Sequence, residues 1–140
     1  MIEQIYTYFT MEMIYFWINL GVLPFWLILI FFPQAKICKI FTISIFPIFI
    51  LSLIYCYLIY QIFQYGHEFS NNSFLILFWV HFLTINLFCG AWIVNDYPKF
   101  GISKILMFVP LVITYLIGPL GIFVYWIIRI FYAKKISLYD

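Results

Sequence analysis

The sequence predicts an all-α integral membrane protein, built as a polytopic four-helix transmembrane bundle. Apolar residues make up 67% of the chain and charged residues 9%, whereas about 25% of residues are charged in a soluble domain. Four apolar stretches each reach the roughly 20 residues that cross a hydrocarbon core of about 30 Å in a helix. They cover residues 13–32, 40–65, 74–95 and 105–132 of a single domain, 1–140. The stretches lack strict two-residue alternation, so helices are favoured over a closed barrel.

The first two stretches are bounded and interrupted by prolines. Pro24 lies inside the first stretch, where it should loosen the helix, and Pro33 ends that stretch. Neighbouring helices in a bundle can satisfy the backbone carbonyl that such a proline leaves free. Pro47 stands near the start of the second stretch, which ends in a tyrosine-rich segment, 55–60.

The third and fourth stretches differ in how they end. Pro98 prevents regular continuation of the third. The fourth is 28 residues long and would measure about 42 Å as one helix, so it must tilt, kink or protrude. We expect a single helix kinked at Gly118-Pro119-Leu120-Gly121. Two separate crossings are disfavoured because each half would be too short.

The basic residues favour one orientation. The loops that follow the first and third stretches together carry four lysines. If four helices cross, the opposite side carries three basic residues, all at the C-terminal end. The first group is Lys36, Lys39, Lys99 and Lys104, and the second is Arg129, Lys134 and Lys135. Acidic residues before the first stretch and lysines after it favour an external N-terminus. We expect a multi-pass protein, located in the cell membrane if the source is bacterial.

Several function classes are disfavoured. The net charge of +2, with no basic cluster beyond Lys134-Lys135, does not indicate nucleic acid as a partner. The sequence has no zinc-binding helix motif, no paired carboxylates and no phosphate-binding loop. It also lacks the nucleophile-elbow motif that carries a catalytic serine. His67 lies in a predicted loop, so the two histidines do not suit a bis-histidine haem. No metal or cofactor is expected.

Polar residues concentrate in the third stretch, and each is a functional candidate because such groups are costly in a bilayer. His81 is the strongest acid–base candidate, since imidazole changes protonation near neutral pH. We expect it to be buried among aromatic rings, although a polar clasp to a neighbouring helix is an alternative. Asp96 could act as a general acid, pair with Arg129 or a lysine, or be a solvated residue at the helix end.

Helical periodicity separates the candidates. At about 100° per residue, His81, Phe88, Trp92 and Asn95 share one stripe, and Asn86 projects about 140° from His81. The aromatic residues could line a site for a conjugated ligand or simply face lipid.

Two asparagines and several small residues permit structural or functional interpretations. Asn19 and Asn86 could contact a ligand or form hydrogen bonds between helices. Gly90 and the turn at 118–121, which includes Gly118, Pro119 and Gly121, permit close helix packing. A ligand notch beside a broken helix is the alternative for that turn.

The order of several motifs resembles a known membrane family. These motifs are Val22-Leu23-Pro24-Phe25, the segment 53–60, Trp79-Val80-His81-Phe82-Leu83 followed by Asn86-Leu87-Phe88 and Asp96, and Gly118-Pro119-Leu120-Gly121. Together they are similar to the abscisic-acid-deficient-four-like family, known in plants for a role in forming the carotenoid neoxanthin. The resemblance extends from about residue 20 to residue 129, and bacterial members are small four-helix proteins.

The resemblance implies a carotenoid or related polyene lipid as ligand. It suggests an isomerase-like, epoxide-opening acid–base reaction in which His81 and Asp96 are catalytic. The residues implied in ligand binding are Asn86, Trp92, Phe88, Asn19 and Tyr125. A non-catalytic carotenoid-binding protein, or an assembly partner for an enzyme, is the alternative. Membrane lipids are further partners, and the size of the unit is compatible with a homodimer.

The sequence departs from the family pattern at two of these positions. Asn86 stands where the family usually has aspartate, and Tyr125 stands where plant members tend to have histidine. The loss of the carboxylate places the plant reaction itself in doubt for this chain.

Overall fold

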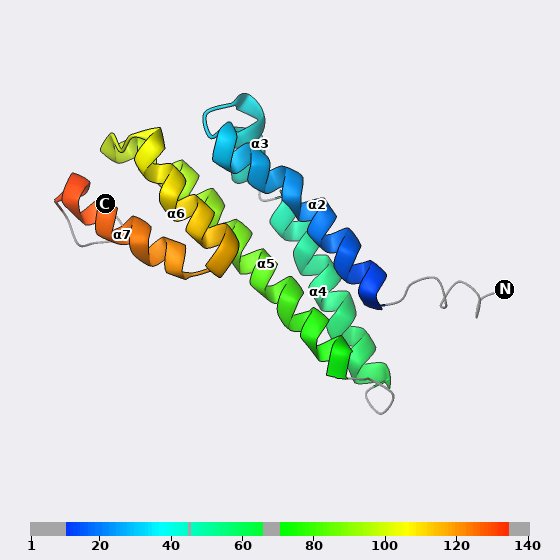
Figure 1. Ribbon diagram of the computed structural model, residues 1–140. Helices are drawn as coiled ribbons and strands as arrows, with labels where there is room; N and C mark the ends of the chain where they lie inside the picture. Colours follow the sequence, from blue (N-terminus) through cyan, green and yellow to red (C-terminus); the bar gives the residue numbers. More distant parts are fainter. Residues whose placement is uncertain (1–10, 45, 66–70, 135–140) are drawn as a thin grey trace.

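The computed structural model describes residues 11–44, 46–65 and 71–134, and this part of the chain is helical without strands (Figure 1). The predicted all-α class is confirmed. The elements are α2 (Met11–Phe31), α3 (Lys36–Ser44), α4 (Phe46–Tyr65), α5 (Asn71–Asp96), the 3₁₀-helix η1 (Tyr97–Phe100), α6 (Lys104–Ile117) and α7 (Leu120–Ala133).

Helix α5 is the centre of the fold. It is the longest helix, with 26 residues, and it contacts every other element (Figure 1). Val80 and Ile93 of α5 are completely buried. Gly90 permits a close approach of α2, because a Cβ atom at this position would lie 2.8 Å from the ring of Trp26. Trp26 is itself buried in the core.

The second predicted stretch contains two helices in the structure. The short α3 begins at Lys36, before the predicted start, and α4 begins at Phe46. Pro47 is the second residue of α4 as the structure describes it. Helix α2, by contrast, continues through Pro24.

The fourth predicted stretch is not one kinked helix, and this expectation is wrong. Helix α6 ends at Ile117, α7 begins at Leu120, and the two helices fold back against each other (Figure 1). A Cβ atom at Gly121 would overlap the side chain of Thr114 in α6, which shows how closely the two backbones approach. Gly118 has a φ of 86°, which glycine adopts readily and other residues rarely do.

The α6–α7 hairpin, residues 104–133, reaches only halfway along α5. Each of its helices has 14 residues, which corresponds to about 21 Å, less than the hydrocarbon core of about 30 Å. Its turn lies beside Asn86 and Phe82 in the middle of α5, and α7 then returns to the end of α5 near Asp96. The hairpin is therefore re-entrant in form, and a fourth complete crossing is absent from the described residues.

The surface of the protein suits a lipid environment. Within the described residues, two helical segments are long and apolar enough to cross a membrane, Lys36–Tyr60 and Phe74–Phe100. Large apolar side chains are exposed on every α-helix, and Phe63 and Ile105 are each 85% exposed. Such extensive exposure of apolar side chains favours association with a membrane.

The hairpin also changes the distribution of charge. The first loop, η1, the start of α6 and the end of α7 all lie at the same end of the molecule (Figure 1). The six basic residues of the described chain are therefore grouped at that end: Lys36, Lys39, Lys99, Lys104, Arg129 and Lys134. The expected division between two sides depended on a fourth crossing, which the hairpin does not make. In proteins that span a membrane, the end richer in lysine and arginine usually faces the cytoplasm.

We predict that both ends of the hairpin are labelled from the same side of the membrane. In a background with the three native cysteines replaced by alanine, Lys104→Cys and Lys134→Cys should react with an impermeant maleimide from the cytoplasmic side. Ser73→Cys, at the opposite end of α5, should react from the other side. Labelling of Lys134→Cys together with Ser73→Cys would contradict the hairpin arrangement.

Candidate functional site

A hollow of about 410 Å³ opens on the outer surface beside α5 and the hairpin turn. Its lining is largely aromatic or apolar, with one imidazole and one carboxamide. The lining residues are Phe78, Trp79, His81, Phe82, Ile85, Asn86 and Pro119. The rings of Trp79 and Phe82 stack with centroids 5.5 Å apart, so the hollow offers a flat aromatic wall to an apolar ligand.

Asn86 is buried without any hydrogen-bond partner. Asn86 is 1% exposed, and neither its Nδ2 nor its Oδ1 makes a hydrogen bond in the structure. Leaving a buried amide unpaired costs about 1–3 kcal/mol by mutational measures. The unpaired amide therefore destabilises the folded protein at a position that also lines the hollow. Such unpaired buried groups are typical of functional residues.

Asn19 provides a direct contrast. Its Oδ1 accepts a hydrogen bond from Trp79 Nε1 at 3.1 Å, and its Nδ2 donates to the carbonyl of Tyr15 at 2.7 Å. This side chain joins α2 to α5, as the interhelical interpretation of the asparagines predicts. Asn86 has no such contact, so that interpretation does not hold for it.

The hairpin turn packs closely against the Asn86 amide. A Cβ atom at Gly118 would lie 2.9 Å from Asn86 Oδ1 and 2.7 Å from the ring of Phe82. Glycine at position 118 thus permits both the reversal of the chain and the close approach of the turn to the carboxamide. Pro119, next in the turn, closes one side of the hollow.

His81 lies at the hollow but is exposed on the outer surface, so its expected burial is wrong. The hairpin ends near Asn86 and leaves the N-terminal half of α5 uncovered on this side. The imidazole packs near Tyr55 of α4, with ring centroids 5.4 Å apart. Although His81 and Asn86 project in different directions from α5, the hollow is wide enough to contact both.

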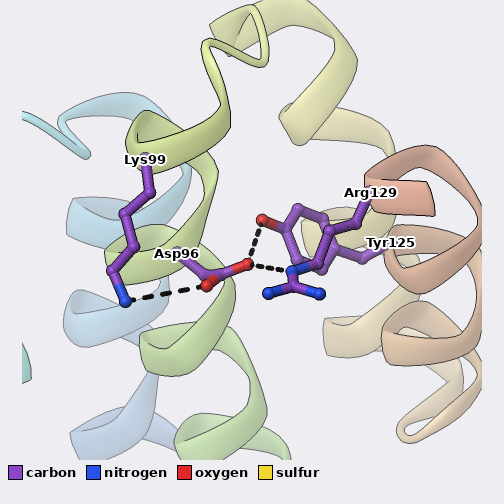
Figure 2. Close-up of polar contacts among 4 residues, drawn as sticks. All are labelled: Asp96, Lys99, Tyr125 and Arg129. Carbon is purple, nitrogen blue, oxygen red and sulfur yellow. Dashed lines mark hydrogen bonds and ion pairs between the residues drawn. The ribbon is translucent and has the colours of Figure 1, made fainter. Parts of the chain in front are cut away.

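A second polar cluster lies at the end of the hairpin opposite its turn (Figure 2). Asp96 Oδ2 accepts hydrogen bonds from Tyr125 OH at 2.9 Å and from Arg129 Nε at 2.8 Å. Lys99 Nζ lies 3.8 Å from Asp96 Oδ1. Asp96 and Arg129 are 4% and 2% exposed, respectively. The Arg129 guanidinium also lies 4.4 Å from the centre of the Phe100 ring, a cation–π contact.

This cluster ties α7 to the end of α5. Of the alternatives for Asp96, the structure shows the one in which it pairs with Arg129 and a lysine. Trp92 of α5 packs edge-on against Tyr125, with centroids 5.6 Å apart. Both carboxylate oxygens of Asp96 are engaged, an arrangement that suits an anchor for the hairpin better than a proton donor.

The structure does not bring His81 and Asp96 together. They are separated by 15 positions on α5, which corresponds to about 22 Å of helix. Trp92 and Tyr125 belong to the Asp96 cluster, and Phe88 is exposed on the outer surface. Asn95 accepts a hydrogen bond from Thr42 of α3.

Sequence reasoning missed most of the aromatic wall. Phe78, Phe82 and Ile85 line the hollow together with Trp79. Their spacing of four and three residues places Phe78, Phe82 and Ile85 on one helical face, which was the signal that could have identified them. Within the described residues, no group of three or more histidine, cysteine, aspartate or glutamate side chains could hold a metal ion.

We predict opposite effects on stability for two matched substitutions. Asn86→Leu should raise the free energy of unfolding by about 1–3 kcal/mol, because it removes an unpaired buried amide. Asn19→Leu should lower it by about 1 kcal/mol, because it leaves Trp79 without its acceptor. Denaturant titration of the purified protein in detergent would measure both, and a loss of stability in Asn86→Leu would refute the expected difference.

We also predict strong coupling within the Asp96 cluster. Arg129→Met should destabilise the protein by about 3–5 kcal/mol, because it leaves a buried carboxylate without its main partner. Adding Asp96→Leu should recover much of that loss, because the unpaired charge is then removed. The same unfolding measurement tests this, and additive losses in the double variant would show that the charges act independently.

A family model supplies the comparison that identifies the chain. The model described as ABA DEFICIENT 4-like matches residues 13–125, which covers α5, the hairpin turn and the hollow between them. No curated protein and no solved structure matches the chain. The match extends over most of the sequence, in agreement with the resemblance of its motifs. The chain therefore belongs to the ABA DEFICIENT 4-like family.

Proposed function

We propose that this protein is a multi-pass integral membrane protein that acts on a carotenoid or related polyene lipid. One observation carries the proposal: an aromatic hollow opens on the apolar surface and holds His81 and Asn86. A polyene could enter it laterally from the bilayer and stack on Trp79 and Phe82. Membership of a family with a known role in carotenoid formation supports this choice of ligand.

The proposed reaction is an isomerisation by acid–base catalysis. A proton is delivered to an oxygen on an end group of the ligand, such as an epoxide, and a proton is lost from an adjacent carbon. Atoms are conserved, so no external oxidant or reductant is required. His81 would transfer the proton because its imidazole reaches the hollow from the exposed side. General acid–base help of this kind contributes about 10²–10⁴-fold.

Asp96 has a different role in this proposal. Its oxygens are bonded to Tyr125 and Arg129 and lie near Lys99. We therefore assign it the positioning of the hairpin, and through the hairpin the position of Gly118 beside Asn86. Proton transfer by Asp96 itself, the role implied by the family resemblance, would require that these bonds open.

A non-catalytic carotenoid-binding or assembly protein is the second candidate. The observation that favours it is the separation of about 22 Å along α5 between His81 and Asp96. Among the residues that line the hollow, His81 is the one acid–base group. A binding protein requires the shape of the hollow but no proton transfer.

We predict that expression in a carotenoid-producing host changes the extracted pigments relative to an empty-vector host. If the protein is an isomerase, His81→Ala should reduce the new product at least about 100-fold, with bound pigment retained. Thr84→Val is the matched control on the same helix, since the Thr84 hydroxyl bonds only within the helix, to the carbonyl of Val80.

The outcomes separate the two candidates. Product formation that persists in His81→Ala would favour the binding protein over the isomerase. A host with unchanged pigments and a purified protein without bound pigment would remove both.

A further inference from the structure

The end of the molecule where the hairpin begins and ends carries a surface of exposed lysines. Lys36 and Lys39 come from α3, Lys99 from η1, Lys104 from the start of α6, and Lys134 from the residue after α7 (Figure 1). Resting on the membrane insertion proposed above, we infer that this lysine surface binds the headgroups of anionic phospholipids in the adjoining leaflet. These lipids are partners in addition to the ligand of the hollow.

The first support is the charge that the fold leaves unbalanced. All five lysines are exposed. Within residues 11–44, 46–65 and 71–134, Asp96 is the one carboxylate at this end of the molecule. Asp96 is buried and bonded to Arg129, so these two charges offset each other. The lysine charges are therefore left without an exposed anion from the described part of the chain.

The second support is that tertiary contacts bring the lysines together. Lys36 and Lys134 are far apart in the sequence, yet α3 packs against α5, and α7 packs against both α5 and η1. Charges of the same sign repel one another over about 8 Å at physiological ionic strength. Folding therefore concentrates positive charge at this end, and bound anions would relieve the repulsion.

The third support is the apolar side chains that stand beside the lysines. Ile37 follows Lys36, Ile105 follows Lys104, and Phe131 lies in the last turn of α7; all three apolar side chains are exposed. Lysines next to exposed apolar side chains are typical of a membrane interface, where the alkyl part of lysine contacts acyl chains and its ammonium group reaches the headgroups. This arrangement favours a lipid over a soluble anion.

The number of lysines favours anionic over zwitterionic lipid. Clusters of about four to eight basic residues beside a membrane-spanning helix are typical sites for anionic lipids, and each lysine near the surface strengthens the association about fivefold. The cytoplasmic leaflet, which basic ends of membrane proteins usually face, is the leaflet that carries negative surface charge. The charge of the surface and that of the leaflet are thus complementary.

The test measures which lipids contact the protein. The full chain is reconstituted in phosphatidylcholine vesicles that contain a fixed fraction of brominated phosphatidylglycerol or, in parallel, of brominated phosphatidylcholine. Bromine quenches tryptophan fluorescence, and Trp92 and Trp126 lie one turn before Asp96 and Arg129, at the lysine end of α5 and α7. We expect about fivefold preference for phosphatidylglycerol at low salt. It should disappear in about 1 M sodium chloride, where screening acts over about 3 Å.

Replacing four of the lysines with glutamine should remove this preference. The quadruple variant Lys36→Gln, Lys39→Gln, Lys104→Gln and Lys134→Gln keeps Lys99, whose ion pair belongs to the cluster that anchors the hairpin. Its preference should fall below about twofold, with quenching by brominated phosphatidylcholine unchanged. The matched variant with arginine at the same four positions keeps the charge and should keep the preference. If the glutamine variant does not fold, the two double variants, one in α3 and one at the hairpin ends, should each lose part of the preference.

The outcomes distinguish this inference from the proposed function. If brominated phosphatidylcholine does not quench the wild-type protein, the chain is not in the bilayer, and the proposed function fails together with the inference. If both brominated lipids quench the wild-type protein equally at low salt, or if the glutamine variants keep the full preference, the inference is overturned while membrane insertion stands. Equal quenching would leave the lysine surface to a soluble acidic partner.

Discussion

The ion pair between Asp96 and Arg129 determines where the last two helices lie. The two side chains are buried, 2.8 Å apart, and reinforced by the hydroxyl of Tyr125. A buried charge without its partner is costly, so the end of α7 is held at the end of α5. With both ends of the hairpin at the same end of α5, its turn must lie partway along that helix. The site beside the turn depends on this constraint.

The hairpin turn and the hollow both result from the packing of the hairpin against α5. Gly118 permits the chain to reverse, and its missing side chain lets the turn pack closely against the Asn86 amide. Because the hairpin stops there, the N-terminal half of α5 remains uncovered, and His81 faces outward. The result is an aromatic hollow that lipid-soluble molecules could reach from the side. Asn19 shows that the fold can satisfy an asparagine between helices where packing alone is required.

Much of the fold could be predicted from composition and spacing. The helical class follows from long apolar stretches, because a backbone in lipid must satisfy its own hydrogen bonds. The concentration of polar residues in one stretch drew attention to the segment that forms α5, the helix that contacts every other element. The family could be recognised from the order of its motifs, and a family model matches residues 13–125.

The sequence by itself determined the helical class, the position of the Gly118-Pro119 break, and the clustering of polar groups on one stretch. Each of these depends on local preferences, which act over a few residues. Only the tertiary structure decided that residues 104–133 return to the end where they began, that Asp96 is paired, and that Asn86 is not. Hydropathy measures how apolar a segment is and carries no information on its direction. A reversal in the middle of an apolar stretch is therefore visible only through the contacts it makes.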